Sequence, residues 1–255
     1  VTSNTQSRRM QPAEFRAAMC LRLLVPIAHT EINHNNDSSS STSHNIECPN
    51  CHLAVLDKFG YHLTSCRGHG NLMVDRHDIL VDALYDLAKK ARFNPTKHAN
   101  DVQCLGESST GIHAFRPADL KIMGDSNDWT CIDITVVSPF ADSRKEKREG
   151  RIPGAAAFTA ANLKDKKHAD NCKANGLEFI PFAVDVCGMM DRRAYNLIKR
   201  FASKIASIEA RPYSYTLSIC LRRISLAIQL GTARQLMRLF PNASSTWADD
   251  VIGLI

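Results

Sequence analysis

The sequence predicts an α/β domain that is preceded by a small Cys/His module and followed by helices. Two apolar segments rich in β-branched and aromatic residues, at 129–138 and 177–186, have the composition of buried strands. They alternate with two helical segments, at 71–93 and 155–174, of which the first repeats apolar residues every three or four positions. Alternation of helices and strands is typical of α/β domains.

Composition and charge are compatible with an enzyme that acts on a nucleic acid and with many unrelated proteins. The chain has 255 residues, of which 44% are hydrophobic, so it can bury a core. The net charge of +6 comes from 32 Lys and Arg against 26 Asp and Glu. This modest excess is compatible with an anionic partner and excludes a histone-like basic protein.

Two further properties of the composition point to an intracellular protein. No stretch approaches the roughly 18 to 20 apolar residues that span a bilayer, and the first ten residues lack the apolar segment of a secretory signal. We therefore expect no membrane partner. The nine cysteines are an odd number and include one C-x-x-C pair, which favours reduced and partly metal-bound thiols over disulfides.

We divide the chain into four regions. A short amphipathic helix at 11–27 and a polar, flexible linker occupy 1–46, and the Cys/His module occupies 47–70. The α/β core covers 71–190 and a C-terminal helical extension covers 191–255. Within the core we expect, in order, a helix, three strands, a helix and a strand, at 71–93, 101–106, 116–123, 129–138, 155–174 and 177–186. In the extension we expect two helices, at 191–208 and 214–239, that cover one face of the sheet.

The Cys/His module has the spacing C-x2-C-x10-H-x3-C. Its four candidate zinc ligands are Cys48, Cys51, His62 and Cys66. Zinc prefers four sulfur or nitrogen ligands in a tetrahedron, and four protein ligands leave no open position, so we expect a structural Zn²⁺ site. Three other histidines compete for this role: His52, His69 and His77. Of these, His77 lies on the long helix and is better suited to capping or packing.

Two acidic residues lie on neighbouring predicted strands. Asp119 precedes one strand, and Asp133 lies inside the apolar strand that follows, where an ionised carboxylate is costly unless it is paired or binds a metal. The two could bind Mg²⁺, which takes one or two carboxylates together with waters and phosphate oxygens. On the helix at 155–174, Lys164 and Lys167 are one turn apart and share a face, whereas Lys166 points elsewhere. The alternative is that these acids are structural and the lysines solvated.

Several motifs together resemble the restriction-like endonuclease domain of non-LTR retrotransposons, a PD-(D/E)XK nuclease preceded by a CCHC zinc knuckle. They are C-x2-C, H-x3-C, Asp75-Arg76-His77, RPAD (116–119), IDITVVSP (132–139), K-x-x-K-H (164–168) and FIPFAVDVCG (179–188). The resemblance covers about residues 10–200 and implies a mixed sheet flanked by helices. In that family the domain follows a reverse transcriptase and nicks target DNA to prime reverse transcription. This implies DNA, element RNA and a reverse transcriptase domain as partners, and a nuclear location. The chain has no polymerase motifs, so it resembles a fragment or a degenerate descendant.

The resemblance also implies site residues. Asp119 and Asp133 match the two acids of the motif and would bind Mg²⁺, and Asp185 matches an acidic position that would assist the metal or hold the lysine. Thr135 stands where such nucleases often have lysine. The resemblance therefore implies that the lysine of the motif lies on the helix at 155–174 instead. Lys164 is the first choice and Lys167 is the second.

Three other functions remain open at this stage. The chain could be a non-catalytic nucleic-acid-binding module, in which the knuckle and basic helices contact phosphates and the acids brace the sheet. It could be a hydrolase that uses the zinc cluster itself, although a closed coordination sphere argues against this. It could also be a structural or host-adopted protein with an unknown partner.

Overall fold

The fold is described by a computed structural model. It describes residues 9–23, 25–26, 47–48, 50–57, 59–66, 68, 72–97, 118–124, 128–141, 144 and 149–239. The predicted linker at 30–46 and the predicted strand at 101–106 lie outside the described residues, as do Arg116, Pro117 and His69.

The described strands form one four-stranded mixed sheet in the order β1-β2-β3-β4. The strands are β1 (Thr96–Lys97), β2 (Leu120–Met123), β3 (Trp129–Val137) and β4 (Glu178–Asp185). The first three are antiparallel neighbours, and β3 pairs with β4 in parallel. A parallel pair needs a long crossover, which α4 (Ala155–Ala174) supplies. The predicted mixed sheet is confirmed, although its edge strand β1 was not anticipated.

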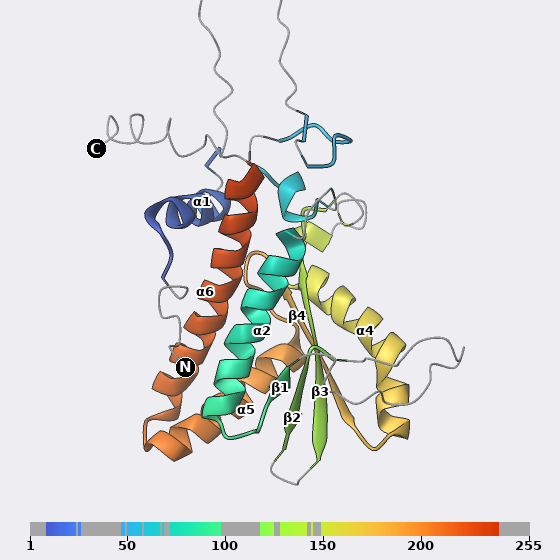
Figure 1. Ribbon diagram of the computed structural model, residues 1–255, viewed down its shortest axis with the longest axis vertical. Coiled ribbons are helices and arrows are strands. Elements are labelled where there is room, and N and C mark those ends of the chain that lie inside the picture. Colours follow the sequence, from blue (N-terminus) through green and yellow to red (C-terminus); the bar gives the residue numbers. More distant parts are fainter. Residues whose placement is uncertain are drawn as a thin grey trace, which may run out of the picture.

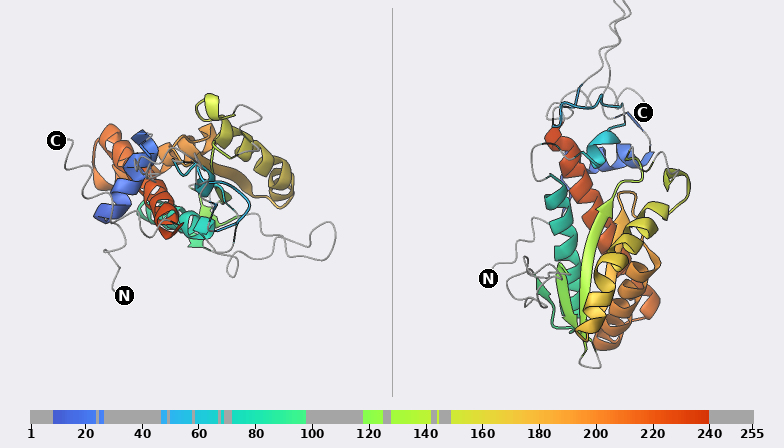
Figure 2. Two further views of the ribbon diagram at one scale, coloured as in Figure 1. Left: turned by 90° about the horizontal axis from the view of Figure 1, so that it is seen from above. Right: turned by 90° about the vertical axis from the view of Figure 1, so that its right-hand side faces the viewer.

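Helices cover both faces of the sheet (Figure 1). One face packs against α4, and the other packs against α2 (Leu72–Lys90) and α5 (Arg192–Glu209). The last helix, α6 (Tyr213–Leu239), packs mainly on α2 and α5 rather than on the strands, so only one of the two predicted C-terminal helices covers the sheet directly. Helix α1 (Pro12–Leu23) lies across α6, as both views in Figure 2 also show.

Side-chain alternation along β3 explains these two layers. Ile132, Ile134 and Val136 point into the main core beneath α2 and α5. The residues between them face α4, where small side chains allow the helix to approach closely: Ala157, Ala160, Ala161 and, from β4, Ala183. Asp133 is on this second face, so β3 presents its one acidic residue to α4.

The C-terminal helices belong to the same packed unit as the sheet. Phe201 of α5 and Ile224 and Ile228 of α6 lie in one buried cluster with Phe182 of β4. Residues on both sides of position 190 therefore share one hydrophobic core, and the division into four regions stays a prediction. None of the described helices has the length and apolar character needed to cross a membrane.

Local sequence sets where the helices begin and end. Asp191 caps α5, because its Oδ1 accepts a hydrogen bond of 2.9 Å from the backbone nitrogen of Arg193. At the other end, Ala210 adopts a left-handed conformation and Pro212 follows, which separates α5 from α6. Helix α4 similarly stops before Gly176, whose φ of 68° is costly for other residues.

Candidate metal centre and acidic site

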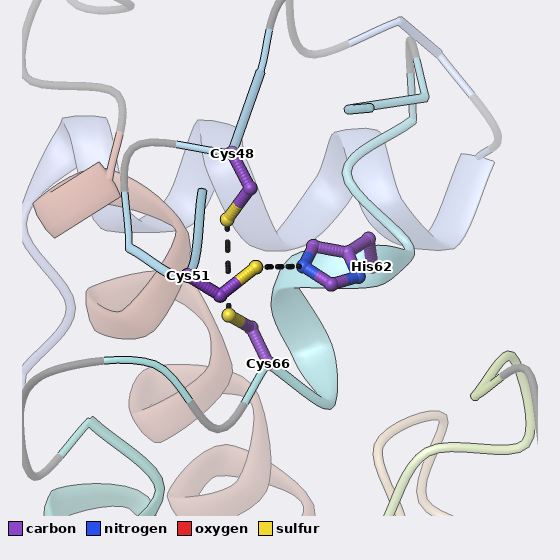
Figure 3. A group of neighbouring side chains, drawn as sticks. All are labelled: Cys48, Cys51, His62 and Cys66. Carbon is purple, nitrogen blue, oxygen red and sulfur yellow. Dashed lines mark hydrogen bonds between the residues drawn. The ribbon is translucent and has the colours of Figure 1, made fainter. Parts of the chain in front are cut away.

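The four predicted zinc ligands converge on one point (Figure 3). Their ligand atoms all lie within 4.8 Å of one another, so the cluster could hold a metal ion. The sulfurs of Cys48 and Cys66 are 3.7 Å apart, and Cys51 Sγ is 3.3 Å from Nε2 of His62. Zn–S bonds of about 2.3 Å in a tetrahedron place two sulfurs about 3.8 Å apart. The geometry is therefore consistent with a structural zinc site.

Hydrogen bonds from the surrounding loop hold the ligands in place. Asn50 Nδ2 donates a 3.2 Å hydrogen bond to the sulfur of Cys66. The carboxylate of Asp57 accepts hydrogen bonds from the backbone nitrogens of Phe59, Tyr61 and His62, which fixes the start of the short helix η2 (His62–Thr64). Such supporting contacts orient metal ligands and raise metal affinity.

The ligand thiols have different electrostatic environments. A backbone hydrogen bond from Leu53 lowers the pKa of Cys51 to about 6, and its contact with His62 acts in the same direction. Burial raises the pKa of Cys48 to about 11. Cys51 is therefore a thiolate at neutral pH, the form in which cysteine binds metals.

Gly68 provides a test of the cluster. An added Cβ at this position would overlap the carbonyl of Asn50 and lie 2.7 Å from the backbone nitrogen of Cys51. We expect Gly68→Ala to weaken zinc binding by about tenfold or more, measured by competition with a zinc-binding dye. Gly124→Ala is the control, because its added Cβ would approach the movable end of the Arg200 side chain and lie at ordinary contact distance, 3.4 Å, from the carbonyl oxygen of Asp128. Equal zinc affinity in both variants would contradict the described packing.

A buried arginine joins the Cys/His module to the α/β core. Nη1 of Arg76, on α2, donates hydrogen bonds to the carbonyl of Thr64 at 3.0 Å and to Oε1 of Gln235 at 2.9 Å. Gln235, on α6, in turn donates to the carbonyl of Leu63. Because Arg76 is only 1% exposed, this network fixes the module against the ends of α2 and α6.

Asp133 is paired with a lysine from α4. Lys164 Nζ lies 3.0 Å from Oδ1 and 2.9 Å from Oδ2 of Asp133. The Asp133 side chain is 9% exposed, and burial raises its pKa although Lys164 opposes the shift. Nε2 of His168, also on α4, lies 3.7 Å from Oδ2. The structure therefore joins the predicted second acid to the first-choice lysine.

Asp119 is paired with a histidine from α2. Oδ2 of Asp119 lies 3.1 Å from Nε2 of His77 and accepts a 2.7 Å hydrogen bond from the backbone nitrogen of Ile134. Burial would raise the pKa of Asp119, but the hydrogen bond and charge of His77 outweigh it and lower the pKa. The charge of Asp119 raises the pKa of Asp133. The two acids thus have opposite pKa shifts.

The His77–Asp119 pair predicts a pH-dependent stability. Burial lowers the pKa of His77, but Asp119 and Asp78 outweigh it and raise the pKa to about 9. Because the pKa is about 6.5 in the unfolded chain, the stabilisation is fully present below pH 6.5 and is lost as pH rises through 9. We expect His77→Gln to remove this part of the free energy of unfolding, measured in urea at several pH values.

Exposed His52 provides the control for this experiment. His52→Gln should keep the loss of stability between pH 6.5 and 9. An imidazole titration of His77 by NMR with a midpoint at or below 6.5 would contradict the pairing.

The other predicted site residues differ in their positions and contacts. Lys167 is exposed on α4, and Thr135 follows Asp133 on the same face of β3. Asp185 is buried at the end of β4, where its Oδ1 accepts hydrogen bonds from the backbone nitrogens of Cys187 and Met189. These contacts shape the turn that leads to α5. The proposed metal-assisting role of Asp185 stays a prediction.

Sequence reasoning did not connect the two histidines with the acids that they contact. His168 lies four residues after Lys164, so helical spacing alone would have placed both on one face towards Asp133. His77 was expected to cap or pack, and its partner Asp119 lies too far along the chain for any spacing rule to indicate.

Comparisons with known proteins do not assign the chain to a family. No family model matches it, and no curated protein matches it.

Proposed function

We propose that this chain is a metal-dependent DNA endonuclease domain that nicks its target, of the restriction-endonuclease-like class found in non-LTR retrotransposons. The observation that carries the proposal is the contact of Lys164 with both carboxylate oxygens of Asp133, at 3.0 and 2.9 Å. An acid on a central strand and an ammonium group on the crossover helix are the charges that phosphodiester hydrolysis needs. The order of the sequence motifs supports the assignment to this class.

Two carboxylates would hold the proposed magnesium ion. Within the described chain, Oδ1 of Asp119 has no hydrogen-bond partner, whereas its Oδ2 is bound to His77 and Ile134. Asp133 would contribute the second carboxylate. Mg²⁺ usually takes one or two protein carboxylates and completes its octahedron with water and phosphate oxygens. Such an ion would polarise the phosphate and lower the pKa of a bound water.

The protein groups would have distinct roles in this reaction. Asp119, whose pKa His77 lowers against the effect of burial, would provide negative charge for the ion. Lys164 would stabilise negative charge that develops on the phosphate next to Asp133. The proposed Zn²⁺ ion would be structural, because four protein ligands complete its coordination.

Nicking of supercoiled plasmid DNA tests the proposal. With Mg²⁺ or Mn²⁺ present, we expect Asp133→Ala and the isosteric Asp133→Asn to lower the nicking rate by about a hundredfold or more. Asp170→Asn is the matched control, since Asp170 is an exposed acid on α4. Equal nicking by the wild type and both Asp133 variants would mean that a contaminating nuclease is responsible, and the proposal would be lost.

A further inference from the structure

A cleft of about 1290 Å³ lies between the Cys/His module and α4. One wall is the module, from Cys51 to Gly68, and the opposite wall is α4. The floor is the carboxyl end of β3 and the residues that follow it. Asp133 and Asp119 do not line the cleft, but Lys164 lines it and also contacts Asp133. The cleft therefore adjoins the acidic site through one side chain.

The charged side chains among the described residues that line the cleft are all cationic. Four cationic side chains line it, from α2, the loop after β3 and α4: Arg76, Arg144, Lys164 and Lys167. No aspartate or glutamate is among the described residues that line it. Cations gathered in a cleft with low-dielectric walls focus a positive potential, which attracts a polyanion.

Arg76 contributes a buried charge that no described acid neutralises. Its guanidinium donates to carbonyl and amide oxygens only, and its Nε has no hydrogen-bond partner within the described residues. Burial lowers the pKa of Arg76 to about 10, so the group stays protonated at neutral pH. An unpaired buried charge is costly, and an anion in the cleft would offset part of that cost.

The lining also indicates what kind of nucleic acid fits. Proteins that bind single strands stack the bases on aromatic side chains. The described lining contains no Phe, Tyr or Trp, and its one imidazole belongs to the candidate metal ligand His62. Contacts to a sugar-phosphate backbone require only cations and hydrogen-bond donors.

We propose that this cleft binds the phosphodiester backbone of a nucleic acid duplex, with Arg144 and Lys167 contacting phosphates and Arg76 supplying charge from below. The inference rests on the proposed function for the identity of that duplex as DNA, and it extends the function by assigning where the duplex lies. Lys164, at the boundary, would connect the bound backbone to Asp133.

Fluorescence anisotropy with a labelled DNA duplex and a labelled RNA duplex of the same sequence tests the inference. The buffer lacks Mg²⁺ and contains no chelator, so that any zinc is retained and no cleavage occurs. We expect Lys167→Ala and Arg144→Ala each to weaken binding of the preferred duplex about eightfold at 0.1 M salt. Each should also reduce the slope of log affinity against log salt by about 0.9.

Lys166→Ala is the matched control, because Lys166 is an exposed neighbour on α4 that does not line the cleft. An equal loss in Lys166→Ala and Lys167→Ala, or an unchanged salt slope in both cleft variants with both duplexes, would overturn the inference. Asp133→Asn separates the two proposals, because Asp133 belongs to the proposed nicking site and does not line the cleft. If the wild type binds through the cleft but never nicks DNA, only the proposed function is contradicted. If it nicks DNA without depending on Arg144 and Lys167, only the inference about the cleft is contradicted.

Discussion

Removal of zinc from the Cys/His cluster is expected to open the segment from Cys48 to Cys66 while the α/β core stays folded. The segment has little apolar packing of its own: Leu63 is its one fully buried leucine, and it packs against Leu21 and Leu236. Structural zinc contributes about 10 to 16 kcal/mol of binding free energy in zinc-finger peptides, which a module of this size cannot replace. None of the described residues of the segment belongs to the main core.

Cys66→Ala should show the effect without a chelator. We expect the wild type to bind one zinc ion. Loss of a contact that only supports a ligand lowers metal affinity about 10- to 100-fold, and loss of the ligand Cys66 should lower zinc affinity by more than that. Limited proteolysis should then cut between Cys48 and Cys66, whereas far-UV circular dichroism should change little because the large helices remain. Added zinc should protect the wild type, and added magnesium should not.

Cys187→Ala is the matched control for this prediction. Cys187 is an exposed thiol outside the cluster, so its loss should change neither zinc content nor protease resistance. If the zinc-free wild type resisted proteolysis as well as the zinc-loaded protein does, the cluster would not be a structural site. A large loss of helix signal would instead mean that the module and the core unfold together through Arg76.

The features that could be predicted from sequence are those fixed by local spacing. The cluster was found because Cys48, Cys51, His62 and Cys66 lie within a short segment with finger-like spacing. The predicted bounds of helix α4 match those in the structure, because small residues mark its packed face and Gly176 marks its end. Strand β3 was equally clear, because a run of β-branched residues is rarely anything but a strand.

The features that sequence missed depend on contacts between distant segments. Strand β1 has two residues, Thr96 and Lys97, which is too short for a periodic signal. It is held by its pairing with β2 and by contacts of Lys97 with α2. The His77–Asp119 pair joins α2 to the start of β2. The cleft likewise requires the module to be fixed against the core, which Arg76 achieves through Thr64 and Gln235.

The choice between the two candidate lysines is also a matter of tertiary structure. Spacing placed Lys164 and Lys167 on one face of α4 and could not separate them. The structure separates them, because only Lys164 contacts Asp133, whereas Lys167 is exposed and lines the cleft. The two should therefore affect different steps of the proposed reaction.

Lys164→Ala is expected to lower the nicking rate at saturating protein by about 10²- to 10³-fold, the usual cost of removing one group that stabilises charge in a transition state. Lys167→Ala should weaken DNA binding but leave the rate at saturation within a few-fold of the wild type. Single-turnover nicking at several protein concentrations distinguishes rate from affinity. Lys164→Arg should restore part of the rate, because a guanidinium keeps the charge near Asp133.

Lys166→Ala, on the same helix, controls for the loss of one positive charge and should resemble the wild type in both quantities. A Lys167→Ala variant with the larger fall in saturated rate would transfer the catalytic role to Lys167. In that case, the Lys164–Asp133 contact would be a structural ion pair that compensates a buried carboxylate between β3 and α4. The ammonium nearest the acid, rather than the more exposed one, is therefore the group on which the proposed chemistry depends.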